Sequence, residues 1–278
     1  LGQCLMDRMR YDNAPETGIT ERRLQESETL CRRWHGADDG RLSYAFTPRF
    51  ALSCSPAMMQ ESAKLAHALG AYWQTHVAED PDEIEAVHQM FPRALDYLDV
   101  YDQAGGLGPK SIFAHGVHMS DRAIARLIET GSHIAHCPSN IFGGGGILDL
   151  GRYLEMGVSV GLATDVGGCT DLSMFKAMEL GWHAQAARGK LTEETRLLKD
   201  PVQWLHLATL AGARVLGLGD RIGSLEVGKD ADLIAVDTSL LTVTPRTDVD
   251  DPVTLLELMI FRNRPDMVRA AWVRGRRL

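Results

Sequence analysis

Five side chains that could do chemistry stand at or near the ends of short apolar segments. They are Arg49, His76, Glu79, His115 and Asp165. Imidazole nitrogens and carboxylate oxygens bind zinc and also transfer protons, whereas a guanidinium offers a planar fork of donors to a carbonyl or a ring nitrogen. Together the five could supply two metal ligands, a proton shuttle and an anchor for a substrate.

Taken one at a time, these residues also have structural explanations. The His-x-x-Glu spacing of His76 and Glu79 occurs by chance in surface or capping pairs, and a buried His115 needs only one or two hydrogen-bond partners. Asp165 could cap a helix, and Arg49 could form a surface salt bridge. The repetition of such residue types at successive segment ends nevertheless favours a site.

Neighbouring residues add to this picture. Phe50, beside Arg49, would give a flat substrate an apolar face. His136 and Cys137 could line the same cavity, but a free cysteine is more often a small core residue, so we assign Cys137 no catalytic role. The run Gly143–Gly146 lacks the lysine of a phosphate loop and the GxGxxG spacing, and we expect a rim loop there.

The segments alternate between strand patterns and helix patterns. Strands are predicted at Leu42–Phe50, Tyr72–Glu79, Ser111–Gly116, His133–Ser139 and Ser159–Asp165. Helices are predicted at Pro56–Leu69, Asp82–Met90, Asp121–Thr130 and Leu148–Met156. This alternation favours a parallel sheet, and no glycine-rich phosphate turn follows the first strand to indicate a doubly wound fold. The predicted class is therefore α/β, a (β/α)8 TIM-like barrel that lacks its first strands and carries functional groups at the carboxyl ends of the others.

The pattern changes after the long helical region Leu172–Leu218. Short β segments are predicted at Arg221–Glu226, Asp230–Asp237 and Val268–Arg274. These are too few for an independent sheet, so we expect them to complete a small β domain whose other strands precede the chain. The predicted division is residues 1–219 for the partial barrel and residues 220–278 for the β-domain segment and the last helix.

Composition narrows the class of protein. The 278 residues are 45% hydrophobic with a formal net charge of −8 and no basic stripe. That balance argues against nucleic acid or an acidic membrane as a partner and suits a small neutral substrate. No apolar run of about 18 residues exists, so no transmembrane helix is expected. Five scattered cysteines without a Cys-x-x-Cys pair indicate reduced thiols and a cytoplasmic location.

The sequence resembles the guanine deaminase family of the amidohydrolase superfamily over nearly the whole chain, and several stretches carry the resemblance. They are Tyr44–Cys54 (YAFTPRFALSC), Thr75–Asp80 (THVAED), Phe91–Gln103 with its YLDVYD core, Phe113–His118 (FAHGVH), Ala135–Asn140 (AHCPSN) and Gly161–Gly168 (GLATDVGG). Asp220–Asp237 resembles the C-terminal signature of the wider superfamily. The TPRF and YLDVYD elements single out guanine deaminases among their relatives.

The resemblance implies a role for each candidate residue. His76 and Asp165 would bind one zinc ion, Glu79 would shuttle protons, and His115 would hydrogen-bond near the attacked carbon. Metal-activated water would then attack the amino-bearing carbon of guanine, and Asp165 would accept its proton. Glu79 would deliver protons to a ring nitrogen and to the leaving amine, giving xanthine and ammonia.

Substrate binding follows from the same resemblance. Arg49 would hold the six-position oxygen of the purine and Phe50 its ring. Contacts to the substrate are expected from Arg49, Phe50, His76, Glu79, His115 and Asp165.

Part of the family's zinc site has no counterpart here. The family takes two further ligands from a His-x-His at the end of its first barrel strand, and the sequence contains no such pair. The pairs His115/His118 and His133/His136 do not have the spacing that shares a strand face. We expect the missing pair to precede Leu1 in a longer polypeptide. The resemblance also implies that the full-length protein is a homodimer. The chain alone should bind zinc weakly and be inactive.

Other interpretations stay open. A deaminase of another purine, a modified guanine or a pterin would use the same metal residues, and iron or manganese would tolerate a similar ligand set. A non-catalytic scaffold is less favoured, because buried carboxylates without a metal or partner are costly. The zinc deaminases with His-x-Glu and Pro-Cys-x-x-Cys are excluded, since the chain has neither motif.

Overall fold

A computed structural model of the chain describes residues 2–8, 18–169, 171–192, 198, 200–241 and 251–278. The chain divides into two compact units, Leu1–Ile134 and Ala135–Leu278. Each unit is described by itself below. Within the described residues, no helix is long and apolar enough to cross a lipid bilayer.

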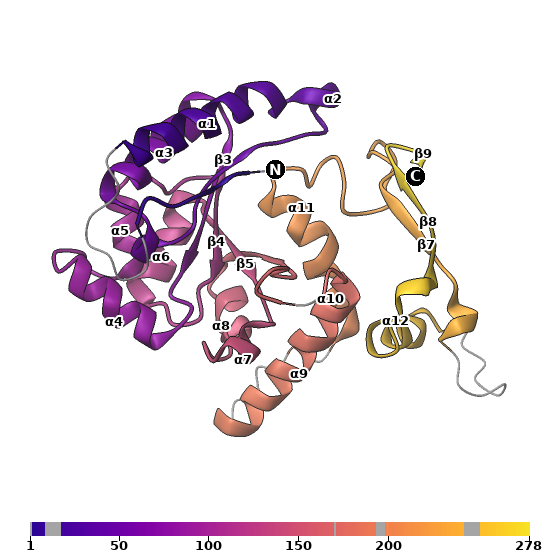
Figure 1. The fold of residues 1–278 in the computed structure, drawn as a ribbon. Helices are drawn as coiled ribbons and strands as arrows, with labels where there is room; N and C mark the ends of the chain where they lie inside the picture. The colour runs from indigo at the N-terminus through magenta and orange to yellow at the C-terminus, as the bar shows by residue number, and fades with distance from the viewer. Residues whose placement is uncertain (1, 9–17, 170, 193–197, 199, 242–250) are drawn as a thin grey trace. The chain divides into compact units, whose positions relative to one another are not determined.

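The first unit is built on parallel strands that follow one another in chain order. They are β1 (Cys4–Leu5), β2 (Ala45–Pro48), β3 (Tyr72–Val77) and β4 (Ser111–His115). In the register of β3 and β4, Val77 is the partner of His115, so the carboxyl ends of these two strands lie side by side (Figure 1). Parallel pairing therefore brings residues far apart in the sequence to one edge.

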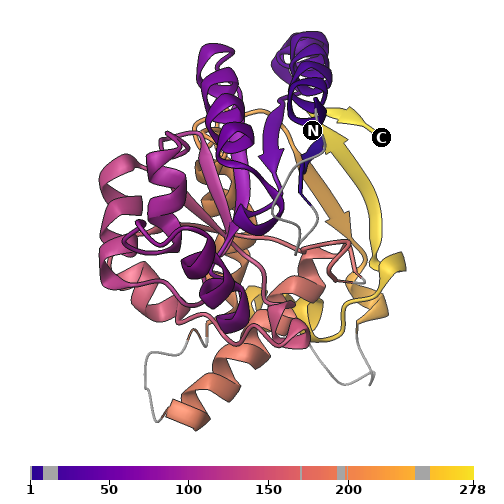
Figure 2. The same ribbon diagram turned by 60° about the vertical axis from the view of Figure 1, so that its left-hand side comes forward.

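Helices connect the strands of this unit. They are α1 (Ile19–Trp34), α2 (Ala37–Gly40), α3 (Pro56–Ala68), α4 (Pro81–Met90), α5 (Tyr97–Gln103) and α6 (Asp121–Thr130), with a 3-10 turn at Ala51–Ser53. The side chains of Ser55, Asp80, Asp96 and Ser120 each accept a backbone amide of the following first turn, which fixes where four of these helices begin. Helices α1 and α3 pack against each other (Figure 2).

Trp73 on β3 is the centre of the first unit's core. Its side chain is 1% exposed, and its ring meets Tyr101 and Phe113 edge-on with centroids 5.5 and 5.9 Å away. The buried indole N–H donates to Ser62 Oγ at 3.1 Å, so the polar end of the ring is satisfied. This core fixes β3, the strand that ends in His76 and Val77.

The second unit begins within β5 (His133–His136) and contains β6 (Ser159–Leu162). Its helices are α7 (Asn140–Gly143), α8 (Leu150–Glu155), α9 (Met174–Thr192), α10 (Pro201–His206), α11 (Gly212–Val215) and α12 (Pro252–Phe261), with a π-helical turn at Leu207–Ala211 and 3-10 turns at Thr238–Leu240 and Pro265–Met267. A Cβ at Gly161 would lie 3.1 Å from the Gly212 Cα. Glycine at position 161 thus permits the close approach of β6 and α11.

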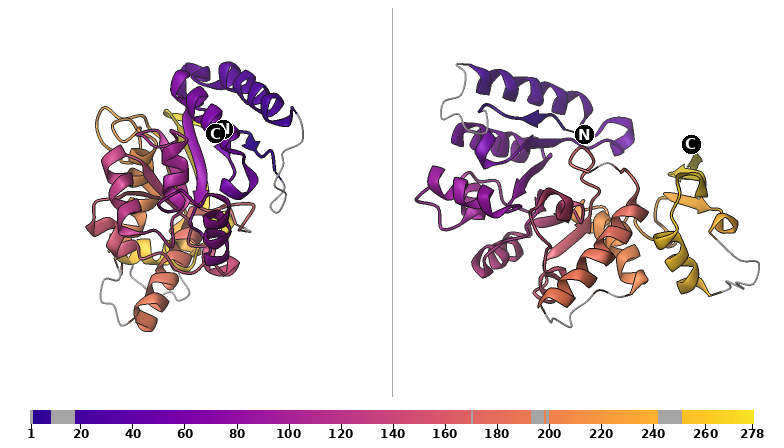
Figure 3. Two further views of the ribbon diagram at one scale, coloured as in Figure 1. Left: turned by 90° about the vertical axis from the view of Figure 1, so that its left-hand side faces the viewer. Right: turned by 60° about the horizontal axis from the view of Figure 1, so that its bottom comes forward.

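A small antiparallel sheet lies near the C-terminus. Its strands are β7 (Leu233–Val236), β8 (Val268–Val273) and β9 (Arg276–Arg277), which are the orange and yellow strands of Figure 3. The α/β fold with a parallel sheet and a small C-terminal β element is thus as the sequence predicted.

The strand predicted at Arg221–Glu226 is wrong. The amides of Arg221 and Ile222 both donate to the Leu218 carbonyl, so the chain turns back on the helical region that precedes it. Gly223 has φ 92°, and a Cβ there would lie 2.8 Å from the Leu210 Cα. The segment is a turn packed on a helix, which its short apolar pattern did not reveal.

Gly181 in α9 offers a test of packing in the second unit. A Cβ there would lie 2.2 Å from the Trp204 ring, which is fully buried. We expect Gly181→Ala to lower the free energy of unfolding by about 1 to 2 kcal/mol, because overpacking outweighs the gain in helix propensity. Gly212→Ala is the matched control, since its nearest contact is an ordinary 3.6 Å. Equal urea midpoints for the two variants would contradict the prediction.

Candidate active site

Three of the predicted site residues meet where β3 and β4 end. The rings of His76 and His115 stack with centroids 5.2 Å apart, and His115 Nε2 lies 3.5 Å from Glu79 Oε2. His115 is 2% exposed, whereas His76 and Glu79 are half-buried. An imidazole and a carboxylate at this separation can pass a proton between them or to a shared substrate.

The ring of His76 has a defined orientation. Its Nδ1 lies 2.7 Å from the Arg49 carbonyl oxygen. Because a carbonyl only accepts, Nδ1 carries the proton, and the neutral ring has its lone pair on Nε2. Metal-binding imidazoles are commonly held by such a bond from the second nitrogen. The donor set of His76 therefore fits a zinc ligand.

Backbone strain marks the turns at this edge. Ala78 (φ 48°) and His115 (φ 71°) are non-glycine residues in the left-handed region, which costs each about 1 to 2 kcal/mol. The Gly116 amide donates to the Val77 carbonyl at 2.9 Å and joins the two turns. Such strain persists only where surrounding contacts impose it, and it is common at functional sites.

Arg49 and Phe50 lie next to this cluster. The guanidinium carbon of Arg49 is 4.4 Å from the centroid of the Phe50 ring, and the Phe50 ring meets His76 edge-on at 6.5 Å. Arg49 is exposed and Phe50 is buried. The pair thus presents a planar donor fork beside an aromatic ring.

Asp165 belongs to the second unit, where it closes a tight turn after β6. It has φ 54°, and its carbonyl accepts the amides of Gly168 and Cys169. The side chain accepts a bond of 3.5 Å from Ser139 Oγ. A Cβ at Gly168 would lie 2.6 Å from Asp165 Oδ2, so the glycine makes room for the carboxylate. The next described helix, α9, begins at Met174, which disfavours the capping interpretation of Asp165.

His136 and Cys137 are core residues. The His136 ring is 3% exposed and lies 6.4 Å from the Trp204 ring. Burial lowers the pKa of His136 to about 4, so the ring is neutral at pH 7. Cys137 is also buried, in keeping with the absence of a catalytic assignment.

Sequence reasoning missed the tyrosines that lie behind the cluster. The Tyr101 hydroxyl donates to the His76 carbonyl at 2.7 Å and accepts the Ala51 amide at 3.0 Å. Tyr97 bonds to Glu83, a buried carboxyl. The only signal in the sequence is the pair of tyrosines four apart in YLDVYD, which share one helix face.

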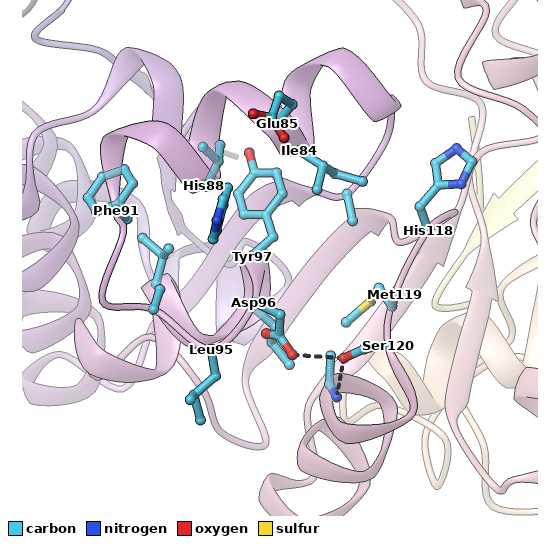
Figure 4. A pocket seen from close by; sticks show the side chains of 16 residues that line it. Ile84, Glu85, His88, Phe91, Leu95, Asp96, Tyr97, His118, Met119 and Ser120 are labelled. Carbon is cyan, nitrogen blue, oxygen red and sulfur yellow. Dashed lines mark hydrogen bonds between the residues drawn. The ribbon is translucent and has the colours of Figure 1, made fainter.

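A cavity of about 300 Å³ also lies in the first unit, between α4, α5 and α6 (Figure 4). Its lining is largely apolar, with Ile84, Phe91 and Met119 among the contributing side chains. The Asp96 carboxylate at its edge is already bonded to Ser120 and Arg122. None of the six residues predicted from the sequence to form the site lines this cavity.

The sequence as a whole matches a known family. The amidohydrolase family profile matches residues 1–278. A probable guanine deaminase of Deinococcus radiodurans is 39% identical over an alignment of 281 positions, which covers 99% of this chain and 62% of that protein. The chain therefore spans less than two thirds of the relative's length.

Solved structures agree with this similarity. The chain matches E. coli guanine deaminase with a TM-score of 0.88 at 33% identity, and guanine deaminase of C. acetobutylicum with guanine bound in its active site with a TM-score of 0.89 at 25% identity. Both matches cover 100% of this chain and 64% of the other. A zinc-containing adenosine deaminase of Xanthomonas campestris matches with a TM-score of 0.79 at 27% identity, over 99% of this chain and 59% of the other.

The burial of His136 predicts a pH dependence of stability. Its pKa is about 4 when folded, against about 6.5 in an unfolded chain. Between pH 6.5 and about 4, the unfolded chain binds a proton at His136 that the folded chain does not bind. The free energy of unfolding is therefore highest above pH 6.5, as far as His136 is concerned, and decreases as the pH falls below that value. From pH 7 to about 4.5, we expect the free energy of unfolding to fall by about 2 kcal/mol more in the wild type than in His136→Gln.

The exposed His88 on α4 provides the control. His88→Gln should keep the wild-type dependence on pH. Identical pH profiles of the urea midpoint for His136→Gln and the wild type would contradict the prediction.

Proposed function

Because the chain belongs to the amidohydrolase family, we propose that it carries catalytic residues of a zinc-dependent guanine deaminase, which hydrolyses guanine to xanthine and ammonia. The observation that carries the proposal is the grouping of His76, Glu79 and His115 at the ends of β3 and β4. Guanine deaminases among the similar proteins favour guanine as the substrate.

We propose His76 and Asp165 as zinc ligands of this chain. The fixed tautomer of His76 and the carboxylate of Asp165, with a glycine beside it, suit that metal. When bound, zinc would lower the pKa of a water ligand toward neutrality. Since the 278 residues contain no His-x-His pair, we propose that they do not complete the zinc site by themselves.

The protein's own side chains would orient the substrate and move its protons. The Arg49 fork donates to the six-position oxygen of guanine, and Phe50 packs against the ring. As the water oxygen bonds to the amino-bearing carbon, Asp165 takes up a proton from that water. Glu79, with His115 beside it, gives its proton to the ring nitrogen, then takes the second proton of that water from the new hydroxyl and passes it to the amine. The carbon–nitrogen bond breaks to release ammonia, and the proton held by Asp165 restores the protonated form of Glu79.

Deamination of another purine is the second candidate, since the adenosine deaminase of Xanthomonas campestris is 27% identical. Adenine has no oxygen at position six, so it offers the Arg49 fork only ring nitrogens as acceptors. Arg49 should therefore contribute more to the binding of guanine than to the binding of adenine.

Ammonia release from guanine tests the proposal. We would compare the chain with a version extended at its N-terminus by the His-x-His strand of a similar guanine deaminase. We expect turnover of guanine by the extended protein only, and a fall in kcat of about 100- to 10,000-fold in its Glu79→Gln variant, because the shuttle is lost. A folded, zinc-loaded extended protein that deaminates adenine or adenosine and leaves guanine untouched would overturn the guanine assignment.

Arg49→Lys in the extended protein tests the anchor. A lysine cannot reproduce the planar fork, so we expect KM for guanine to rise about tenfold, equivalent to about 1.4 kcal/mol, with kcat changed less. Exposed Arg93→Lys is the control and should leave KM unchanged. An unaltered KM in Arg49→Lys would remove Arg49 from the binding site.

A further inference from the structure

Glu83 is a buried carboxyl that the proposed reaction does not use. It lies in the first turn of α4 and is 3% exposed. Its Oε2 accepts the backbone amide of Glu79 at 3.3 Å, and its Oε1 accepts a short bond from the Tyr97 hydroxyl. Burial raises the pKa of Glu83, whereas the bonds from Tyr97 and from nearby backbone amides act in the opposite direction. A carboxyl in such a place costs free energy unless its partners compensate.

The contacts continue from Glu83 to the other end of the same turn. The Tyr97 and Tyr101 rings lie 5.5 Å apart with their hydroxyls 3.4 Å apart. Tyr101 in turn donates to the His76 carbonyl. Burial raises the pKa of both tyrosines, so both stay protonated and can donate.

The turn that carries the proton shuttle is therefore held at both ends. Tyr101 fixes the carbonyl of His76, and Glu83 fixes the amide of Glu79. Between them lies Ala78 in the left-handed conformation, which an unrestrained chain would leave. The position of the Glu79 carboxylate beside His115 depends on this restrained turn.

We propose that Glu83 is a positioning residue for Glu79, and that Tyr97 is the donor that keeps the Glu83 carboxylate in place. The inference rests on the proposed function, in which Glu79 shuttles protons. It also gives Tyr97 of the YLDVYD segment a role, because the Tyr97 hydroxyl holds the carboxylate that supports the shuttle.

Glu83→Leu in the extended protein tests this inference. The leucine leaves the Glu79 amide without its acceptor, so we expect kcat for guanine to fall about 10- to 100-fold with KM changed less than about threefold. Hydrogen exchange in the peptide spanning residues 77–84 should become at least about tenfold faster, because the hydrogen bond from the Glu79 amide to Glu83 no longer protects the turn. Glu83→Gln should restore most of the lost kcat and most of the protection from exchange, since the glutamine amide oxygen can accept the Glu79 N–H.

Two comparisons separate positioning of Glu79 from general support of the fold. Glu85→Leu, an exposed position on the same helix, should match the wild type in kcat and exchange. In a Glu79→Gln background, Glu83→Leu should slow the residual reaction no further, because the group it positions is already gone. The inference would be overturned if the double variant had a kcat about 10- to 100-fold below that of Glu79→Gln alone. It would also be overturned if Glu83→Leu left kcat and exchange unchanged.

Two safeguards keep the test decisive. If Glu83→Leu fails to fold, Tyr97→Phe takes its place, because it removes the donor to Glu83 with little change in shape. This variant should also speed exchange in the peptide spanning residues 77–84. If the wild-type extended protein does not turn over guanine, the proposed function fails. Exchange in the peptide spanning residues 77–84 then decides by itself whether Glu83 holds the turn.

Discussion

Three donors converge on the carbonyl oxygen of Arg49. The backbone amide of His76 lies 3.1 Å away, its ring Nδ1 lies 2.7 Å away, and the Thr75 hydroxyl lies 3.2 Å away. Parallel pairing of β2 and β3 brings the amide there, and the two side chains then follow from the register. A single backbone oxygen thus joins the residue expected to hold the substrate to the residue expected to hold the metal. It also selects the tautomer of His76, which no property of the isolated side chain would determine.

Burial of the polar groups near this oxygen costs free energy unless they are hydrogen-bonded. In this structure they are buried with hydrogen-bond partners. Glu83, Tyr97 and Tyr101 are buried, and each takes part in at least one hydrogen bond. The apolar packing of Trp73 against Tyr101 supports the same region from the core side. Free energy gained in that core offsets the left-handed turns, so the strained conformations are properties of the folded unit.

Residue type and position along a strand sufficed to predict which side chains meet at the ends of β3 and β4. His76 and His115 could be expected to meet, because the carboxyl ends of neighbouring parallel strands share an edge. Glu83 could not be recognised, because an acidic residue in the first turn of a helix is ordinarily a surface residue that favours the helix dipole. Its burial depends on Tyr97, which lies on a different helix. The turn at Arg221–Glu226 escaped prediction for a similar reason: contacts with Leu210 and Leu218 override a short apolar pattern.

Two parts of the proposed catalytic site are therefore oriented independently of each other. The His76 ring is oriented by a backbone carbonyl and the Glu79 turn by Glu83, and all of these groups belong to the first unit. Their arrangement is established by folding, so binding of metal or substrate need not provide the free energy to create it. Loss of a proposed zinc ligand would then lower zinc affinity while Glu79 keeps its place. Loss of Glu83 would displace the proposed shuttle, Glu79, while the His76 ring keeps its tautomer, because the Arg49 carbonyl is untouched.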